Sequence, residues 1–453
     1  MTDHTRDDRT DALRRRLLQA GAGAATLGAI PGASLLGAQA QKAFDWKRFD
    51  GEKIEVLLVK SPRGDLLSRY HKEFEDMTGI SVGSEMVPEQ QQRQKAVIEF
   101  NSGNPSFDVI ALSYHVQKRQ FAKNNWLTDL RPMMNDRLLA DPKLDFADFA
   151  QGGLNYAVEA DGRVMSLPFN LDPWVVYYNK ELFAAKGVAF PKTFAQMIDA
   201  AAKLNDPGKG VSGFVGRGLK NANVPVWTSF LLGYGGGFID KSGKLMTDSA
   251  EAVESAKMYQ TLLGKYGPQG VAGYNWNEAQ SLFLQGKAAM WLDGIGFAQQ
   301  LEDPTKSRIV GKVGYGVMPA GPKQQVSALF ADGEGISAYS KKKGPAWFYL
   351  QWASNKANQT RMLQAAAGAP VRTSAYAAAQ ASSDFKSPKE WVECMLASAK
   401  IAQPGLPVIA AVTEFRDTFG IALTNMINGA DPASELKRAT AEFQPVLDKT
   451  EKA

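Results

Sequence analysis

The sequence predicts a protein of two α/β lobes with a C-terminal helical portion, and three observations lead to this fold class. The chain of 453 residues is longer than one hydrophobic core usually serves, so two domains or one bilobal unit are expected. Strand-like and helical runs alternate after residue 40, which is typical of a parallel sheet covered by helices. From about residue 346 onward the apolar spacing becomes mainly helical.

The first lobe is predicted from three strands with helices between them. Strand-like runs cover 53–59, 80–87 and 107–112, and helical runs cover 65–78 and 91–100. Ligands of parallel sheets bind at the carboxyl ends of the strands. Side chains just beyond two of those ends are therefore candidate ligand contacts: Glu89, Gln90, Tyr114 and His115.

A second α/β region begins near Pro168. It contains a strand at 175–178, a helix around 193–204 and a glycine-rich turn at 233–237. The position of this region, after a complete strand and helix series, supports a second lobe.

Residues 1–40 have the features of an export signal. Three arginines at 14–16 precede a stretch rich in Ala, Gly and Leu that ends in Ala38-Gln39-Ala40, with small residues where a signal peptidase cleaves. Consecutive arginines before a weakly hydrophobic stretch resemble a twin-arginine signal, although Leu18-Gln19 stands where that pattern usually has Phe and a basic residue. We expect cleavage after about Ala40 and a periplasmic mature protein.

Composition argues against several function classes. The net charge of +5 is small and no long basic run occurs, so nucleic-acid binding is not expected. The single cysteine, Cys394, can form no intramolecular disulfide, and with His71 and His115 it makes no convincing zinc site. No phosphate-binding or dinucleotide-binding glycine motif is present, so no cofactor is implied. A pair of carboxylates for glycoside hydrolysis stays open, because its spacing is spatial.

The most informative stretch is 167–187, with the sequence LPFNLDPWVVYYNKELFAAKG. It resembles the signature of the family 1 extracellular solute-binding proteins of bacterial ABC transporters, to which the maltose binder belongs. Pro168, Phe169 and Asn170 fit the start of that signature, and Tyr178-Asn179 fits its central pair. Ala185 departs from the pattern, which carries a polar or charged residue there.

Weaker resemblances to the same family follow in order along the chain, at 107–110, 126–130, 283–293 and 347–372. The resemblance implies a periplasmic-binding-protein-like fold, in which crossover segments join two lobes and a ligand binds in the cleft between them. It assigns residues 41–168 and about 294–330 to the N-terminal lobe. Residues 169–293 and about 331–453 form the C-terminal lobe with the terminal helices.

The predicted site centres on 170–174, which the resemblance places at a crossover. Asn170, Asp172 and Trp174 supply an amide, a carboxylate and an indole, which suit the hydroxyls and C–H faces of a sugar. Each also has a structural interpretation, since Trp174 could belong to the core and Asp172 could cap a turn. Further candidates come from the other crossovers, a later basic position and an aromatic residue before a helix: Asp293, Asp332, Arg372 and Trp227.

The resemblance implies a monomer that binds a carbohydrate in the cleft and delivers it to the membrane permease subunits of an ABC importer. Contact with the membrane would occur only through that complex. Two alternatives stay open at this point. One is an exported carbohydrate-active enzyme, and the other is the same fold with a polyol, a polyamine or glycerol phosphate as its ligand.

Overall fold

The computed structural model describes residues 43–159, 161–383, 385 and 387–452, and the predicted export signal at 1–40 lies outside them. Within this part of the chain, no helix combines the length and the apolar content that crossing a bilayer requires.

The first half of the molecule is built on a parallel sheet, as the alternating pattern predicted. Strand β1 (Lys53–Val59) pairs in parallel with β2 (Ser81–Val87) on one side and with β3 (Val109–Ser113) on the other. Three helices connect or follow these strands: α2 (Pro62–Thr78), α3 (Glu89–Ser102) and α4 (Tyr114–Lys123). The predicted strand–helix series is therefore confirmed.

The start of α2 is fixed by its own sequence. The Ser61 hydroxyl accepts a hydrogen bond from the Gly64 amide at 3.2 Å, and Pro62 occupies the first helical turn, where its missing N–H is not needed. A Cβ on Gly64 would lie 2.3 Å from the carbonyl oxygen of Val59, so glycine lets the helix begin close to the end of β1.

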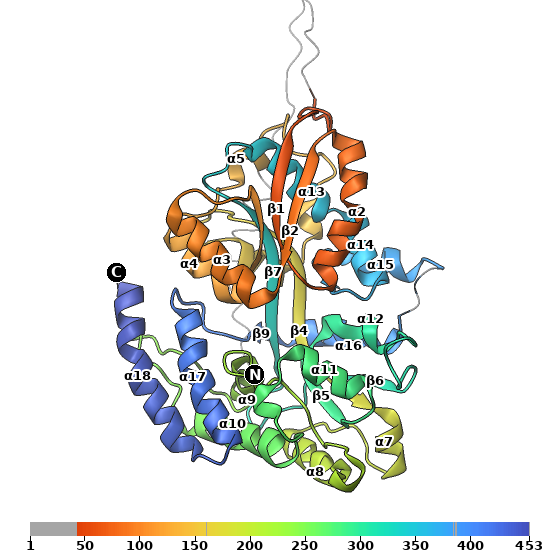
Figure 1. The fold of residues 1–453 in the computed structure, drawn as a ribbon, viewed down its shortest axis with the longest axis vertical. Helices are drawn as coiled ribbons and strands as arrows, with labels where there is room; N and C mark the ends of the chain where they lie inside the picture. The colour runs from red at the N-terminus through yellow and green to blue at the C-terminus, as the bar shows by residue number, and fades with distance from the viewer. Residues whose placement is uncertain (1–42, 160, 384, 386, 453) are drawn as a thin grey trace, which may run out of the picture.

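Two long strands connect the halves of the molecule. Strand β7 (Ser327–Ile336) pairs antiparallel with β3 and with the first part of β4 (Leu167–Asn179). The later part of β4, from residue 174, pairs instead with β5 (Met290–Gly294) and β6 (Val313–Gly316). Figure 1 shows β4 and β7 running from the part that holds β1 and β2 into the part that holds β5 and β6.

The sheet order is β2-β1-β3-β7-β4-β5, and two short strands complete it: β8 (Ala369–Pro370) beside β4 and β9 (Ala402–Pro404) beside β7. The register of β4 against β7 shifts between Pro168 and Asn170. A local irregularity of this kind bends a strand, and here it immediately precedes the predicted site at 170–174.

Helices cover both halves. Those that pack with the first half, besides α2 to α4, are α5 (Arg131–Met134), α6 (Gln151–Ala157), α13 (Lys343–Ala353), α14 (Lys356–Gln364) and α15 (Thr373–Gln380). Those of the second half are α7 (Lys180–Ala185), α8 (Phe194–Leu204), α9 (Val224–Gly233), α10 (Ala250–Gln260), α11 (Trp276–Leu284), α12 (Ala298–Leu301), α16 (Lys389–Lys400), α17 (Val412–Ile427) and α18 (Pro432–Lys452).

The packing differs from the predicted division of the chain. Residues 294–330 were assigned to the N-terminal lobe, but β6 in that range pairs with the later part of β4. Residues 331–453 were assigned to the C-terminal lobe, but α13 packs on α2 and β1. The reason is that β7 returns the chain to the first half, so α13 to α15, which follow it, pack there before α16 to α18 complete the second half (Figure 1).

Candidate ligand-binding cleft

A cleft of about 640 Å³ lies between the two halves, a volume within the usual range of small-molecule sites. On the first half its walls are the carboxyl ends of β1 and β3 and the first residues of α2 and α3. On the second half they are the start of α11, the loop that holds Arg217, and Arg416 on α17. The strand-end rule therefore located the wall that the first half contributes.

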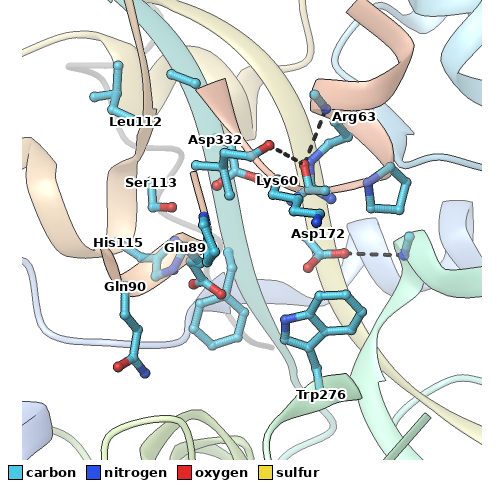
Figure 2. A pocket seen from close by; sticks show the side chains of 18 of the residues that line it. Lys60, Arg63, Glu89, Gln90, Leu112, Ser113, His115, Asp172, Trp276 and Asp332 are labelled. Carbon is cyan, nitrogen blue, oxygen red and sulfur yellow. Dashed lines mark hydrogen bonds and ion pairs between the residues drawn. The ribbon is translucent and has the colours of Figure 1, made fainter. Parts of the chain in front are cut away.

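Six of the predicted site residues line this cleft: Glu89, Gln90, His115, Asp172, Trp174 and Asp332. Figure 2 shows Glu89, Gln90 and His115 gathered on one side, and Asp172 and Asp332 on the strands that cross between the halves. Residues from three separate parts of the sequence are thus brought together.

Three predicted residues lie behind the cleft wall. The Tyr114 hydroxyl accepts a hydrogen bond from Ser166 at 2.8 Å, and its ring stacks on Tyr156 with centroids 5.7 Å apart. The Asn170 side-chain amide donates to Asp332 Oδ2 at 3.2 Å, and its oxygen accepts from the Ala369 amide at 3.0 Å. Asn170 therefore orients a lining residue.

Asp293 is the third, and it is completely buried. Its carboxylate forms a two-pronged ion pair with the guanidinium of Arg217, with Arg217 Nε 2.9 Å from Asp293 Oδ2. The predicted crossover carboxylate thus positions an arginine that lines the cleft.

Two predicted residues are placed elsewhere. Trp227 is fully buried in the second half, where its indole donates to Ser255 at 2.8 Å and stacks on Phe419. Arg372 is 2% exposed, and its guanidinium donates to the Ser354 carbonyl at 2.6 Å. Neither lines the cleft. The Trp227 indole is packed in the core and the Arg372 guanidinium is hydrogen-bonded to the backbone, whereas the sequence analysis predicted that both groups contact a ligand.

Sequence reasoning missed the cationic residues of the cleft. Arg63 lies 2.9 Å from Asp332 in an ion pair, which Figure 2 shows above Asp172. The guanidinium carbon of Arg217 lies 5.0 Å from the centre of the Trp174 ring. Arg63 is in the first turn of α2, four residues after the end of β1, so the strand-end rule could have found it, whereas no local pattern marks Arg217.

An aromatic surface on the second half was also missed. Trp276 and Phe297 both line the cleft and stack with centroids 5.2 Å apart. Trp276 is the first residue of α11, which Asn275 and Glu278 cap reciprocally. That capping pattern could have predicted the helix start, but not its position beside Asp172, which Figure 2 shows.

The charges of the cleft differ in their proton affinity. Burial raises the pKa of Asp172 to about 7, with Asp332 and Asp293 adding to this effect and Arg63 opposing it. Burial also acts to raise the pKa of Glu89, but the neighbouring guanidiniums outweigh it and lower that pKa to about 2. Asp172 therefore titrates near neutrality, while Glu89 stays ionised.

His115 and Arg416 complete the electrostatic picture. Burial, followed by repulsion from Arg93 and Arg416, lowers the pKa of His115 well below its usual value, so the imidazole is neutral. Burial and neighbouring guanidiniums lower the pKa of Arg416 to about 9, and the group remains charged at neutral pH.

This arrangement suits a ligand with many hydroxyl groups. Carboxylates accept hydrogen bonds from hydroxyls, guanidiniums donate to their oxygens, and aromatic rings cover C–H faces. Among the residues that the structure describes, no group of three or more His, Cys, Asp or Glu side chains is placed to hold a metal ion.

Comparisons with known proteins agree with this geometry. The erythritol/L-threitol-binding protein of Mycolicibacterium smegmatis is 26% identical over 422 residues, which cover 87% of this chain and 86% of that protein. The mannitol-binding protein of Pseudomonas aeruginosa is 24% identical and covers 68% of this chain and 70% of its own length.

Solved structures show the same fold. A solute-binding protein of Agrobacterium radiobacter K84 in complex with ribitol matches with a TM-score of 0.80 and 25% identity, over 88% of this chain and 99% of that one. A maltose-bound protein of T. maritima matches with a TM-score of 0.77 and 23% identity, over 87% and 99%. The family model for bacterial extracellular solute-binding proteins matches residues 62–360. The chain belongs to the bacterial extracellular solute-binding protein family, as the signature around Asp172 predicted.

Proposed function

We propose that this protein binds a small polyol or sugar in the cleft between its halves and delivers it unchanged to the permease of an ABC importer. The observation that supports the proposal best is the cleft itself, where the ion-paired side chains Arg63, Asp332 and Arg217 line the same cavity as the stacked rings of Trp276 and Phe297. Relatives named for erythritol, L-threitol and mannitol binding point to the same ligand class.

The ion pairs explain how such a cleft would hold an uncharged ligand. In each pair the carboxylate and the guanidinium neutralise one another, and the hydrogen-bonding capacity left over can serve hydroxyl groups. The Arg63–Asp332 pair offers the ligand both hydrogen-bond donors, on Arg63, and acceptors, on Asp332. Asp293 holds the guanidinium of Arg217 in place as a further donor. A linear polyol, with a hydroxyl on every carbon, fits this alternation of donors and acceptors.

A thermal-shift screen followed by calorimetry tests the ligand class. Erythritol, ribitol, D-mannitol and maltose would be added to the purified protein, with spermidine and glycerol 3-phosphate as representatives of the other classes. A ligand present at 100 times its dissociation constant adds about 2.7 kcal/mol of stability. Stabilisation by spermidine or glycerol 3-phosphate alone would contradict the proposal.

The rival interpretation is an exported carbohydrate-active enzyme. The family consists of binding proteins. The Asp172 carboxyl, whose pKa is near 7, can accept hydrogen bonds from ligand hydroxyls and can also transfer protons, so both functions could use it. Prolonged incubation with maltose and maltotriose, followed by chromatography, separates the two functions. A binding protein returns both sugars intact, whereas any hydrolysis product would favour the enzyme.

We further propose that the protein acts as a periplasmic monomer, exported through the twin-arginine route with cleavage after Ala40. The arginines at 14–16 and the small residues at 38–40 support this. The intact mass of protein from the periplasmic fraction would show the cleavage site. Replacement of Arg15 and Arg16 by lysine should abolish export, and continued export would exclude the twin-arginine route.

A further inference from the structure

Part of the cleft extends into the interior of the first half. Leu58 on β1 and Leu67 on α2 are 1% and 2% exposed, and Phe169 on β4 is 5% exposed, yet all three line the cavity. Gly64, which brings α2 close to the end of β1, lines it as well. We call this part of the cleft the recess and define it by Leu58, Gly64, Leu67, Phe169 and Glu334.

The strand register shows to which face of the sheet the Glu334 side chain points. Glu334 on β7 lies opposite Ala111 on β3 and opposite Leu167 on β4. Paired residues of antiparallel strands point to the same side. Leu58, Leu67 and Phe169 belong to the same apolar cluster as Leu167. Because all three also line the cavity with Glu334, the recess lies between the start of α2 and this face of the sheet.

Glu334 is the polar group of the recess. Its side chain is 3% exposed, it lines the cavity, and its Oε1 atom is buried without a hydrogen-bond partner. Burial raises the pKa of Glu334 to about 8, and no charged side chain among the described residues offsets this, so the carboxyl is mainly protonated at pH 7. A buried polar atom without a partner is costly, so such a group indicates a missing partner.

We propose that the recess receives one terminal hydroxymethyl group of the ligand and that Glu334 is its specificity-determining hydrogen-bond partner. The CH₂ group would contact Leu58, Leu67 and Phe169, and the hydroxyl would bond to the carboxyl of Glu334. A neutral carboxyl both donates and accepts, as a hydroxyl does, which makes the two groups complementary. This inference rests on the proposed binding of a polyol or sugar.

The proposed hydrogen bond to Glu334 predicts that the protein binds a ligand without the terminal hydroxyl more weakly. A site built to hydrogen-bond a hydroxyl rejects an analogue without it, because the buried polar group of the protein is then left unpaired. If the recess lacked a polar group, the order of the two affinities would reverse, since a methyl group would fit there and a hydroxyl group would not. The recess therefore has a measurable signature that a purely structural glutamate lacks.

The test compares two ligands on the wild type, two variants and one control variant by calorimetry. The ligands are whichever of erythritol, ribitol and D-mannitol binds the wild type most tightly, and its dideoxy analogue, in which both terminal hydroxyls are replaced by hydrogen so that neither end carries a hydroxymethyl group. The variants are Glu334→Gln, which keeps a donor and an acceptor, and Glu334→Leu, which removes both. Glu334→Ala replaces the leucine variant if added bulk prevents folding, and Glu393→Leu, on the exposed side of α16, is the control.

We expect Glu334→Gln to bind the polyol within about threefold of the wild type. Glu334→Leu should bind the polyol at least tenfold more weakly, while its affinity for the dideoxy analogue stays within about threefold. Equal losses for both ligands, or no loss for either, would overturn the recess and leave the proposed function standing. If neither the polyols nor maltose binds the wild type, the proposed function fails and this inference fails with it.

Discussion

Asp172 is expected to destabilise the ligand-free protein, and its replacement by asparagine should reveal this. The pKa of the carboxyl rises from 3.8 to about 7 on folding because burial disfavours the charged form. At 1.36 kcal/mol per pKa unit, this corresponds to about 4 kcal/mol of lost stability once the group is ionised in both states. The side chain is only partly buried, so we expect about 2–4 kcal/mol at pH 8.

The sign follows from proton binding. Between pH 4 and pH 7 the folded protein keeps the proton of Asp172 and the unfolded chain has lost it, so the free energy of unfolding falls as the pH rises. Above pH 7 both states are ionised and the loss stays constant. Asparagine has the same shape, carries no charge and can still accept the hydrogen bond from the Gly296 amide, which is 3.3 Å long.

Urea unfolding of the wild type and Asp172→Asn at pH 4, 6 and 8 measures the effect. The variant should be more stable by about 2–4 kcal/mol at pH 8 and nearly equal to the wild type at pH 4. Asp199→Asn, on the exposed face of α8, is the matched control and should show no such trend. A variant that is less stable than the wild type at pH 8, or a gain in stability that does not change with pH, would refute the reasoning.

In the proposed function, the same variant should bind its ligand about ten- to a hundredfold more weakly, because a charge-assisted hydrogen bond contributes roughly 1.5–3 kcal/mol.

Three other outcomes are expected. Trp276→Ala should weaken polyol binding at least tenfold in calorimetry and leave the melting temperature nearly unchanged, since the indole covers ligand at the cleft surface; unaltered affinity would exclude this contact. Trp227→Ala should show the reverse, with about 3–5 kcal/mol less stability in urea unfolding and normal affinity of the remaining folded protein, because the side chain lies in the core; weakened binding by fully folded protein would contradict this. Saturating ligand should reduce the radius of gyration in small-angle scattering as the halves close around it, and an unchanged radius would argue against hinge motion.

The parts of the site that the sequence predicted are those governed by topology. Glu89 and His115 were predicted because they follow β2 and β3, and the carboxyl ends of parallel strands lie at the same edge of a sheet. Asp172 and Trp174 were found through the family signature, which fixes the crossover strand. Both rules act on the backbone, and the backbone pattern is readable from the order of strands and helices.

The parts that were missed depend on packing between distant segments. Trp227 and Trp276 are both aromatic residues in or near a helix start, and only the tertiary fold places one in the core and the other in the cleft. Arg372 was a reasonable ligand contact until the structure showed its guanidinium bonded to backbone carbonyls. The lobe boundaries failed for a similar reason, since a strand that returns to the first half leaves no mark in composition.

Strand β4 has a consequence for how this protein can diverge. The segment around Asp172 holds cleft residues and also joins the two halves, so a mutation there would change the lining of the cleft and the connection between the halves at the same time. Arg217 and Trp276 lie outside that strand, in a loop and at a helix start. New ligand specificities should therefore arise first at such positions, where a substitution leaves the strand that joins the two halves unchanged. Within the cleft, β4 should be the part whose sequence changes most slowly.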